Sequence, residues 1–226
     1  MSFFVRTSRP DDWQIHLAEP NKQWKIGHSA KALAYCWMEA EGFPSSVKRV
    51  FQKSKYSVFK DIDFLAGFVE HKVLLPGGVH PSQNDIFILA KSKKDLVAIA
   101  VEGKVSESFG ETIRNWLKDE SKGKKTRLKF LNELLQLNQD GLQEIRYQLL
   151  HRTASAVIEA KRFNASTALM LVHSFSHTHE RFDDYSNFAS LFGITARLNA
   201  IHLAKRIDDV NLYLAWITGE KEYLMK

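Results

Sequence analysis

Residues 84–104 read N-D-I-F-I-L-A-K-S-K-K-D-L-V-A-I-A-V-E-G-K, and this stretch decides the fold. Two short apolar runs flank a polar, lysine-rich connection, a pattern typical of a β-hairpin whose strands are buried on both faces. A four-residue turn at residues 92–95 would pair Lys91 with Leu96. The sequence therefore predicts two central strands of a sheet.

Three charged residues interrupt the apolar pattern at one end of this hairpin. With the turn at residues 92–95, Asp85 falls opposite Glu102, and Lys104 projects to the same face as Glu102 because side chains two apart share a face. Burying such charges costs several kcal/mol unless they are compensated. Mg²⁺ or Mn²⁺ would compensate them, held by Asp85, Glu102 and the carbonyl of Gly103, with Lys104 orienting the attacking water. The alternative is a buried ion pair at the hairpin end.

This arrangement resembles the PD-(D/E)XK nuclease superfamily, in which an acid near the start of one strand and a (D/E)-x-K triplet on the next bind metal. The resemblance implies that Asp85, Glu102 and Lys104 hydrolyse phosphodiesters. The sequence departs from the pattern at one position, since Asn84 precedes Asp85 and the nearest proline is Pro81.

Two further triplets of this form occur, Glu-His-Lys at residues 70–72 and Glu-Ala-Lys at residues 159–161. The buried strand before Glu102 and its partner acid favour the hairpin triplet. Glu70 lies on a predicted strand, residues 64–75, that would neighbour the hairpin. It is either a further residue of the same site or half of an edge-strand ion pair.

Helical residues supply three more candidates through the same resemblance. An acid of the first helix sometimes completes the metal site in that superfamily, which implicates Glu39 on the predicted helix 29–41; the alternative is a solvated helix glutamate. The helix after the triplet strand, predicted at residues 142–163, often adds a polar residue. Gln148 and Arg152 are the candidates there, against ordinary hydrogen bonding on a helix surface.

The densest basic cluster begins in a predicted loop, residues 121–126, ahead of a predicted helix at residues 128–135. The chain carries a formal net charge of +6, a mild preference for a polyanionic partner. The cluster is either a contact for a nucleic-acid backbone or a solvated surface. Its members are Lys122, Lys124, Lys125, Arg127 and Lys129.

A zinc site has weaker support. Cys36 is the single cysteine, which excludes a multi-cysteine site. His173, His177 and His179 fit neither an H-E-x-x-H motif nor a zinc-finger pair, so packing and loop hydrogen bonds are favoured for them.

The order of predicted elements indicates an α/β fold in one domain covering residues 1–226. A helix, a strand, the hairpin, helices and a strand at residues 168–175 give α-β-β-β-α-β, the core order of restriction-endonuclease-like folds with a mixed central sheet flanked by helices. Additional elements extend both termini: residues 1–27 as an irregular arm, and a helix at residues 183–192 followed by strands at residues 194–203 and 210–217. Helix starts are expected at Ser29 and at Ser108, which forms a capping box with Glu111.

Four segments also resemble an uncharacterised bacterial family of unknown function. They read E-H-K-V-L-L-P-G-G, S-Q-N-D-I-F, V-E-G-K-V-S-E-S-F-G and R-Y-Q-L-L-H-R-T-A-S-A-V-I-E-A. This resemblance supports the predicted fold and implies no activity.

Two hypotheses follow for function. The first is a Mg²⁺- or Mn²⁺-dependent phosphodiester hydrolase acting on nucleic acid, and the second is a non-catalytic nucleic-acid- or protein-binding domain of the same fold. No run of 18 apolar residues and no apolar leader occurs in the chain, so we expect a cytoplasmic protein without a membrane partner. The sequence leaves the oligomeric state open.

Overall fold

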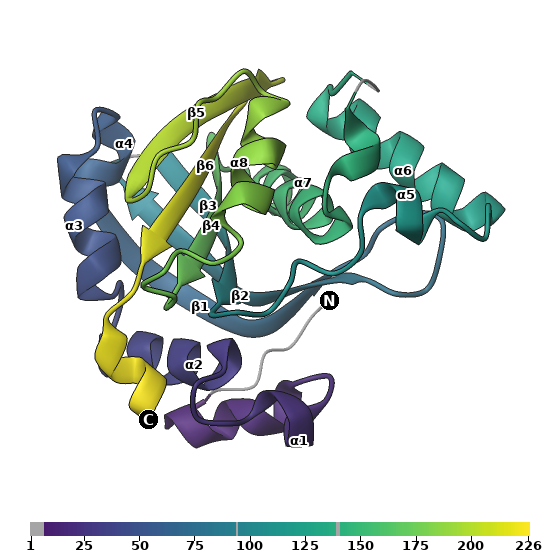
Figure 1. Ribbon diagram of the computed structural model, residues 1–226. Helices are drawn as coiled ribbons and strands as arrows, with labels where there is room; N and C mark the ends of the chain where they lie inside the picture. The colour runs from purple at the N-terminus through teal and green to yellow at the C-terminus, as the bar shows by residue number, and fades with distance from the viewer. Residues whose placement is uncertain (1–6, 94, 139–140) are drawn as a thin grey trace.

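A computed structural model describes residues 7–93, 95–138 and 141–226 as an α/β fold around a mixed six-stranded sheet (Figure 1). The strand order in the sheet is β1-β2-β3-β4-β6-β5. The strands are β1 (Ile62–Val73), β2 (Ser82–Ser92), β3 (Asp95–Lys104), β4 (Thr167–Ser174), β5 (Ala200–Ile207) and β6 (Val210–Thr218).

The hairpin of β2 and β3 has the predicted register. Lys91 pairs with Leu96 and Ser92 with Asp95, which confirms the turn at residues 92–95. β3 then pairs in parallel with β4, and β4 with β6, while β1 and β5 add antiparallel edges. The helix α7 (Tyr147–Arg162) lies between β3 and β4 in the chain, as a parallel connection requires.

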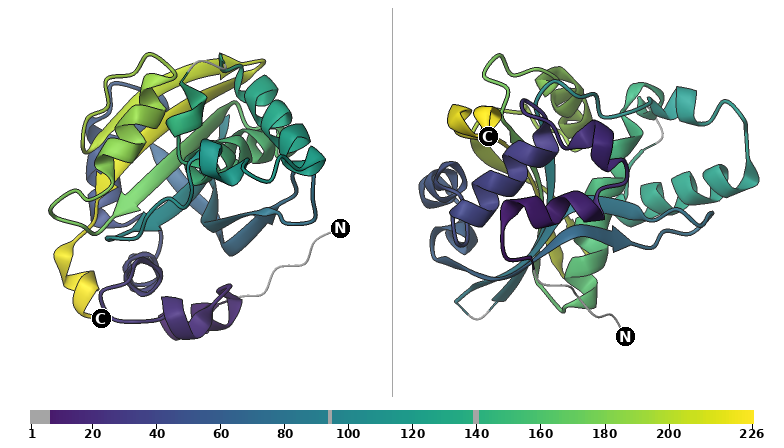
Figure 2. Two further views of the ribbon diagram at one scale, coloured as in Figure 1. Left: turned by 45° about the vertical axis from the view of Figure 1, so that its right-hand side comes forward. Right: turned by 90° about the horizontal axis from the view of Figure 1, so that it is seen from below.

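Helices cover both faces of the sheet (Figure 1, Figure 2). One face packs against α6 (Lys122–Leu135), α7 and α8 (Phe182–Ser190). The other packs against α2 (Ser29–Glu39), α3 (Ser45–Lys53) and α4 (Ser57–Lys60). Side chains alternate along β3 between the two cores, so Ala98 and Ala100 contact the α7 side while Val97 and Ile99 contact the α2 side.

Three helix boundaries differ from the predictions. Residues 121–126, predicted as a loop, form the first turns of α6, because the Ser121 side chain accepts a hydrogen bond from the Lys124 N–H and so caps the helix. The helix expected from Ser108 is the short α5 (Ile113–Trp116), which Thr112 caps. The helix predicted at residues 142–163 is divided into η2 (Leu142–Glu144) and α7, because Arg146 has extended backbone and pairs with Thr112.

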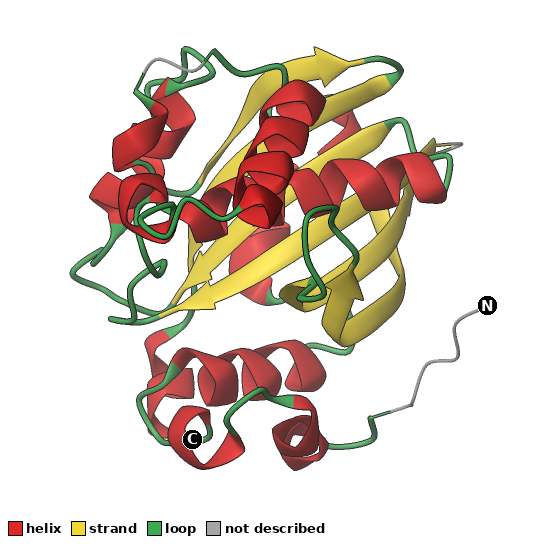
Figure 3. Cartoon of the chain, turned by 90° about the vertical axis from the view of Figure 1, so that its right-hand side faces the viewer, coloured by secondary structure: helices red, strands yellow, loops and turns green. Residues whose placement is uncertain are grey.

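Elements from both terminal segments of the chain pack against α2 (Figure 3). Within the predicted irregular arm, η1 (Pro10–His16) and α1 (Pro20–Gln23) are helical, and residues 1–6 lie outside the described part of the chain. At the other end, η3 (Lys221–Met225) follows β6, and the carbonyl of Leu224 accepts a hydrogen bond from the Gly27 N–H. The strand predicted at residues 194–203 begins later, as β5.

Across the ranges that the structure describes, no helix has both the length and the apolar content that crossing a bilayer requires.

Candidate functional site

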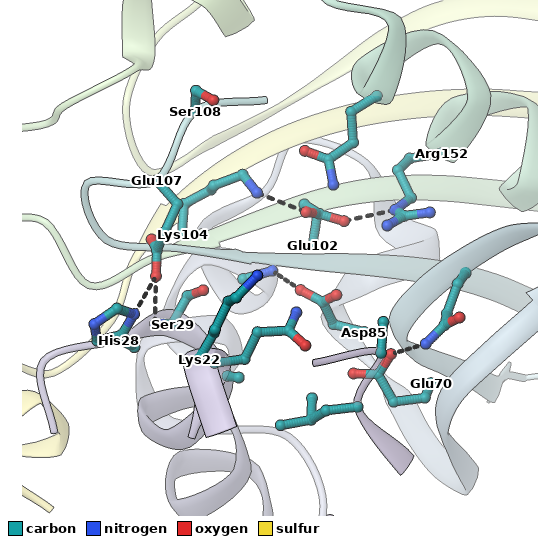
Figure 4. Close-up of a pocket in the computed structure, with 17 residues that line it drawn as sticks. Lys22, His28, Ser29, Glu70, Asp85, Glu102, Lys104, Glu107, Ser108 and Arg152 are labelled. Carbon is teal, nitrogen blue, oxygen red and sulfur yellow. Dashed lines mark hydrogen bonds and ion pairs between the residues drawn. The ribbon is translucent and has the colours of Figure 1, made fainter. Parts of the chain in front are cut away.

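A cavity of about 360 Å³ opens at the carboxyl end of β3, between α2 and α7 (Figure 4). Carboxyl ends of parallel strands are common ligand positions in α/β sheets. The cavity collects residues from three consecutive strands and from the helix that follows them. Of the residues predicted for the site, those that line it are Glu70, Asp85, Glu102, Gly103, Lys104, Gln148 and Arg152.

Glu102 is the most fully compensated charge in this cavity. Its side chain is 3% exposed; Lys104 Nζ donates to Oε1 at 2.7 Å, and Arg152 Nε donates to Oε2 at 2.6 Å. Burial alone would raise the pKa of Glu102, but the two cations outweigh it and lower the pKa. Burial acts against the charge of Arg152 as well, yet Glu102 and Asp85 raise the pKa of its guanidinium. The triplet glutamate is therefore ionised and held between two cations.

Asp85 lies on the other side of β3 from Glu102, which corrects the predicted shared face. Its Oδ2 accepts a hydrogen bond from the Gly103 N–H at 2.7 Å. A Cβ placed on Gly103 would point toward α2, 3.1 Å from Leu33 Cδ2 and 3.3 Å from the same Oδ2. Glu102 and Lys104, the neighbours of Gly103 along the strand, project to the α7 side (Figure 4). The backbone of Gly103 thus separates the two carboxylates.

The physical reason is an irregularity at the end of β2. In a regular strand Ser82 and Ile86, four residues apart, would share a face. Instead Ser82 bonds His151 of α7, while Ile86 belongs to the core on the α2 side. The β2–β3 ladder ends at the pair of Ile86 and Val101, and Glu70, opposite this point on β1, has a φ of 51°. Val69 still pairs with Ile86 and His71 with Asn84, so the register of β1 with β2 is unbroken here. The change of face at Glu70 and Asp85 turns Asp85 away from the face that a regular hairpin would give it.

Glu70 and Asp85 form an acidic pair with raised pKa values. Burial raises the pKa of Asp85 to about 7, and the charge of Glu102 adds to the effect. Burial likewise raises the pKa of Glu70 to about 8, with Asp85 contributing, although Gln83 Nε2 donates a hydrogen bond to Glu70. Two carboxyl groups that resist ionisation beside a third that is ionised indicate a site short of positive charge.

The donor atoms around the cavity fit a hard divalent cation. Gln148 Oε1 is buried without a hydrogen-bond partner and belongs to a residue that lines the cavity. With Glu70, Asp85 and Glu102 it makes an all-oxygen set of the kind that Mg²⁺ and Mn²⁺ prefer. The three carboxylates are not gathered around one point: among the described residues, the one group of three acidic, histidine or cysteine ligands whose atoms lie within 4.8 Å of one another is elsewhere. A cation shared by Asp85 and Glu102 would require their side chains to move toward one another.

Sequence reasoning missed the residues that line the cavity from the N-terminal elements. Lys22 of α1 and His28 and Ser29 at the start of α2 face it, and Glu107 accepts hydrogen bonds from the Ser29 and Val105 N–H groups at 2.8 and 2.7 Å (Figure 4). For Glu107, the sequence offered one indication that it belongs to the site, namely its position three residues after Lys104. Lys22 has no motif around it that could have identified it.

Other predicted residues lie away from the cavity. Glu39 pairs with Lys226 at 3.3 Å and does not line it. In the basic cluster, Lys124 pairs with Asp119, Lys125 with Glu120 and Lys129 with Glu133. Arg127 is buried and donates to the carbonyls of Leu75 and Pro76, and Lys122 opens α6. The nucleic-acid contact predicted for the cluster of Lys122, Lys124, Lys125, Arg127 and Lys129 stays a prediction.

The group with close ligand atoms is Cys36, His173 and Glu220, and its hydrogen bonds argue against a metal. The indole N–H of Trp37 can only donate, and it donates to His173 Nδ1 at 3.1 Å. Burial lowers the pKa of His173 to about 3, so the ring is neutral and its proton is on Nε2, 3.2 Å from Ser46 Oγ. Nε2 therefore has no free lone pair for an ion. Packing and hydrogen bonds account for His173, as the sequence predicts.

Comparisons with known proteins identify a family and no activity. The family model described as Domain of unknown function (DUF6946) matches residues 6–221. Nothing matches the chain among curated proteins or among solved structures.

Proposed function

The chain belongs to the domain family that matches residues 6–221, and from its cavity we propose that it is a metal-dependent phosphodiester hydrolase acting on nucleic acid. One observation carries the proposal: three acidic side chains from consecutive strands, Glu70, Asp85 and Glu102, surround a cavity that also holds an amine and a guanidinium. We propose further that the fold is restriction-endonuclease-like. The order α2, β1, β2, β3, α7, β4 and the antiparallel-then-parallel pairing support it.

Each residue would have a distinct part in the reaction. Asp85 and Glu70, once deprotonated, would hold Mg²⁺ or Mn²⁺ with Glu102, the Gly103 carbonyl and Gln148 Oε1. The cation would polarise a phosphoryl oxygen and lower the pKa of water. Lys104 Nζ would orient the attacking water, and Arg152 would stabilise the charge that grows on the phosphate. Both cations hold Glu102 in place before substrate binds.

A pair of substitutions tests the metal site and the amine separately. We expect Glu102→Gln to weaken Mn²⁺ binding about tenfold, because it removes a charge from the site. Lys104→Ala should bind Mn²⁺ within about threefold of the unchanged protein yet lose phosphodiesterase activity by about 100-fold or more. Calorimetric titration with Mn²⁺ and cleavage of mixed nucleic acids are the measurements. Lys60→Ala, at an exposed lysine of α4 that does not line the cavity, is the matched control.

Glu102→Gln also breaks a buried ion pair, which can affect folding as well as metal binding. Asp85→Asn is therefore a second variant of the metal site. Circular dichroism tests whether each variant is folded. We expect Asp85→Asn to weaken Mn²⁺ binding as well. Cleavage that survives Glu102→Gln and Lys104→Ala would place the chemistry elsewhere in the chain.

A second function is favoured by one specific observation. Both oxygens of Glu102 are engaged by cations of the protein itself, which is also the arrangement of a stable internal ion pair. A non-catalytic domain that binds nucleic acid or protein would keep this pair closed. The same Mn²⁺ titration separates the two functions, since no binding dependent on Glu102 is expected for the second.

A further inference from the structure

Three adjoining depressions, together called the groove, lie in a row from the cavity across the N-terminal end of α7. A second depression, of about 390 Å³, shares Ser108 and Gln148 with the cavity. A third, of about 260 Å³, shares Trp116, Tyr147 and His151 with the second. Residues common to each neighbouring pair place the three depressions side by side. The third depression is called the far depression below. No residue that lines it has a part in the proposed reaction.

The far depression is lined by basic and neutral groups. Among the described residues that line it, none is acidic. Arg127 is 8% exposed there; its Nε donates to the Pro76 carbonyl at 3.0 Å and its Nη2 to the Leu75 carbonyl at 3.4 Å. These carbonyls fix the guanidinium in place but do not neutralise its charge. Lys124 reaches the same depression with its ammonium over the ring of Trp116 and 2.8 Å from Asp119. No carboxylate of the described residues forms an ion pair with Arg127, and a fixed, buried cation in this situation favours an anion beside it.

His151 adds a hydrogen-bond donor whose tautomer the network assigns. Arg152 Nη1, which can only donate, lies 3.5 Å from His151 Nδ1, so this nitrogen is an acceptor and Ser82 Oγ, 2.7 Å away, donates to it. Burial and the charge of Arg152 lower the pKa of His151 and keep the ring neutral. The ring proton is then on Nε2, the nitrogen that Ser82 does not occupy. His151 lines both the second and the far depression, where this N–H can donate.

We propose that the far depression is a phosphate subsite, in which Arg127, Lys124 and His151 bind one phosphate of a polynucleotide whose reacting phosphate lies in the cavity beside Arg152. The inference rests on the proposed function and deepens it, because it makes the substrate a chain with at least two phosphates. The proposal also assigns only part of the predicted basic cluster to phosphate binding. Lys124 and Arg127 face the groove, whereas Lys122, Lys125 and Lys129 do not line it.

Binding without catalysis tests the subsite. The probe is a fluorescein-labelled single-stranded DNA of twelve nucleotides, titrated in EDTA by fluorescence anisotropy over a range of salt concentrations. We expect Lys124→Ala to reduce the affinity about five- to tenfold and to lower the slope of log affinity against log salt by about 1, since one phosphate contact is lost. Lys129→Ala removes an equal charge from the same helix, outside the groove, and should change the affinity by less than about twofold. His151→Ala should also reduce the affinity, about fivefold, but leave the slope unchanged because the imidazole is neutral.

Competition distinguishes the source of the phosphate. Inorganic phosphate that displaces the probe no better than chloride of equal ionic strength would indicate a subsite for the polynucleotide backbone, and stronger displacement would indicate one for free phosphate. Equal effects of Lys124→Ala and Lys129→Ala, or no binding of the labelled DNA, would overturn the subsite. The two proposals can fail separately. If the protein neither binds Mn²⁺ nor cleaves nucleic acid, but Lys124→Ala still weakens DNA binding more than Lys129→Ala does, the hydrolase proposal is wrong and the subsite is supported.

Discussion

Glu102 illustrates how the cost of a buried charge depends on its partners. Removing one member of a buried ion pair leaves the others uncompensated and typically costs about 3–5 kcal/mol, whereas an exposed pair contributes about 1 kcal/mol or less. We expect Glu102→Gln to lower the free energy of unfolding by about 3 kcal/mol, because Lys104 and Arg152 lose their shared anion. Urea denaturation followed by circular dichroism measures the change.

The control for this prediction is Glu144→Gln. Glu144 pairs with Arg114, and both side chains are more than 60% exposed, so the change should be within about 0.5 kcal/mol. An equally small effect at Glu102 would mean that the buried cations find other partners.

Asp85 and Glu70 predict a stability that falls as pH rises. Their folded-state pKa values, raised to about 7 and about 8, lie above the ordinary values of 3.8 and 4.5, so the folded protein binds more protons than the unfolded chain between those limits. Their contribution is complete below about pH 4 and is lost as pH rises toward 8. We expect urea denaturation to show lower stability at pH 8 than at pH 5.5, and Asp85→Asn to remove about a third of the difference, because the pKa of Asp85 is the lower of the two.

Mn²⁺ should oppose this trend, because the cation binds the deprotonated carboxylates and its affinity should increase over the same interval. A flat stability profile in the unsubstituted protein would show that Glu70 and Asp85 ionise normally.

At these positions the sequence predicts which side chains line one cavity better than it predicts how they are oriented. The buried run before Glu102 was enough to select it over the triplets at residues 70–72 and 159–161, because few charges survive on such a strand uncompensated. The orientation of Asp85 was not predictable, since it depends on a change of face within β2 and on a positive φ at Glu70. The residue types at these two positions do not indicate either feature. A glycine would have suggested an unusual backbone conformation, but both positions are occupied by acidic residues.

At the scale of elements, the docking of α6 on the turn after β1 can be tested at one glycine. Gly77 has a φ of 80°, and a Cβ there would overlap the carbonyl oxygen of Gly123 at the start of α6. We expect Gly77→Ala to destabilise the protein by about 3 kcal/mol, from the left-handed backbone and the displaced helix together. Gly110→Ala is the control, since Gly110 has a φ of 70° with nothing near its Cβ position, and should cost about 1 kcal/mol. Similar values from urea denaturation would show that α6 adapts without loss.

Elements with strong periodicity were predictable and their ends were not. The hairpin, α2, β4 and α7 follow from apolar runs that a buried sheet and its covering helices require. The start of α6 was missed because Gly123 and the lysines around it resemble a loop, whereas the Ser121 cap and the packing of Gly123 against Gly77 stabilise a helix. The interruption before α7 was missed because the pairing of Arg146 with Thr112 is a tertiary contact with no local pattern.

For the whole molecule, the sheet is the structure that the two cores have in common. Ala98, Ala100 and Trp216 pack on the α7 side, and Val97, Ile99 and Ile217 on the α2 side, from the same strands. Loss of either helical layer would expose apolar residues of β3 and β6 to water at about 25 cal/mol for each Å², so neither layer is stable alone. We therefore expect one cooperative unfolding transition, with tryptophan fluorescence and far-ultraviolet circular dichroism coinciding at every urea concentration. Two separated transitions would show that the helices at the two termini, η1, α1, α2 and η3, unfold independently, and that the cavity they close can open while the sheet stays folded.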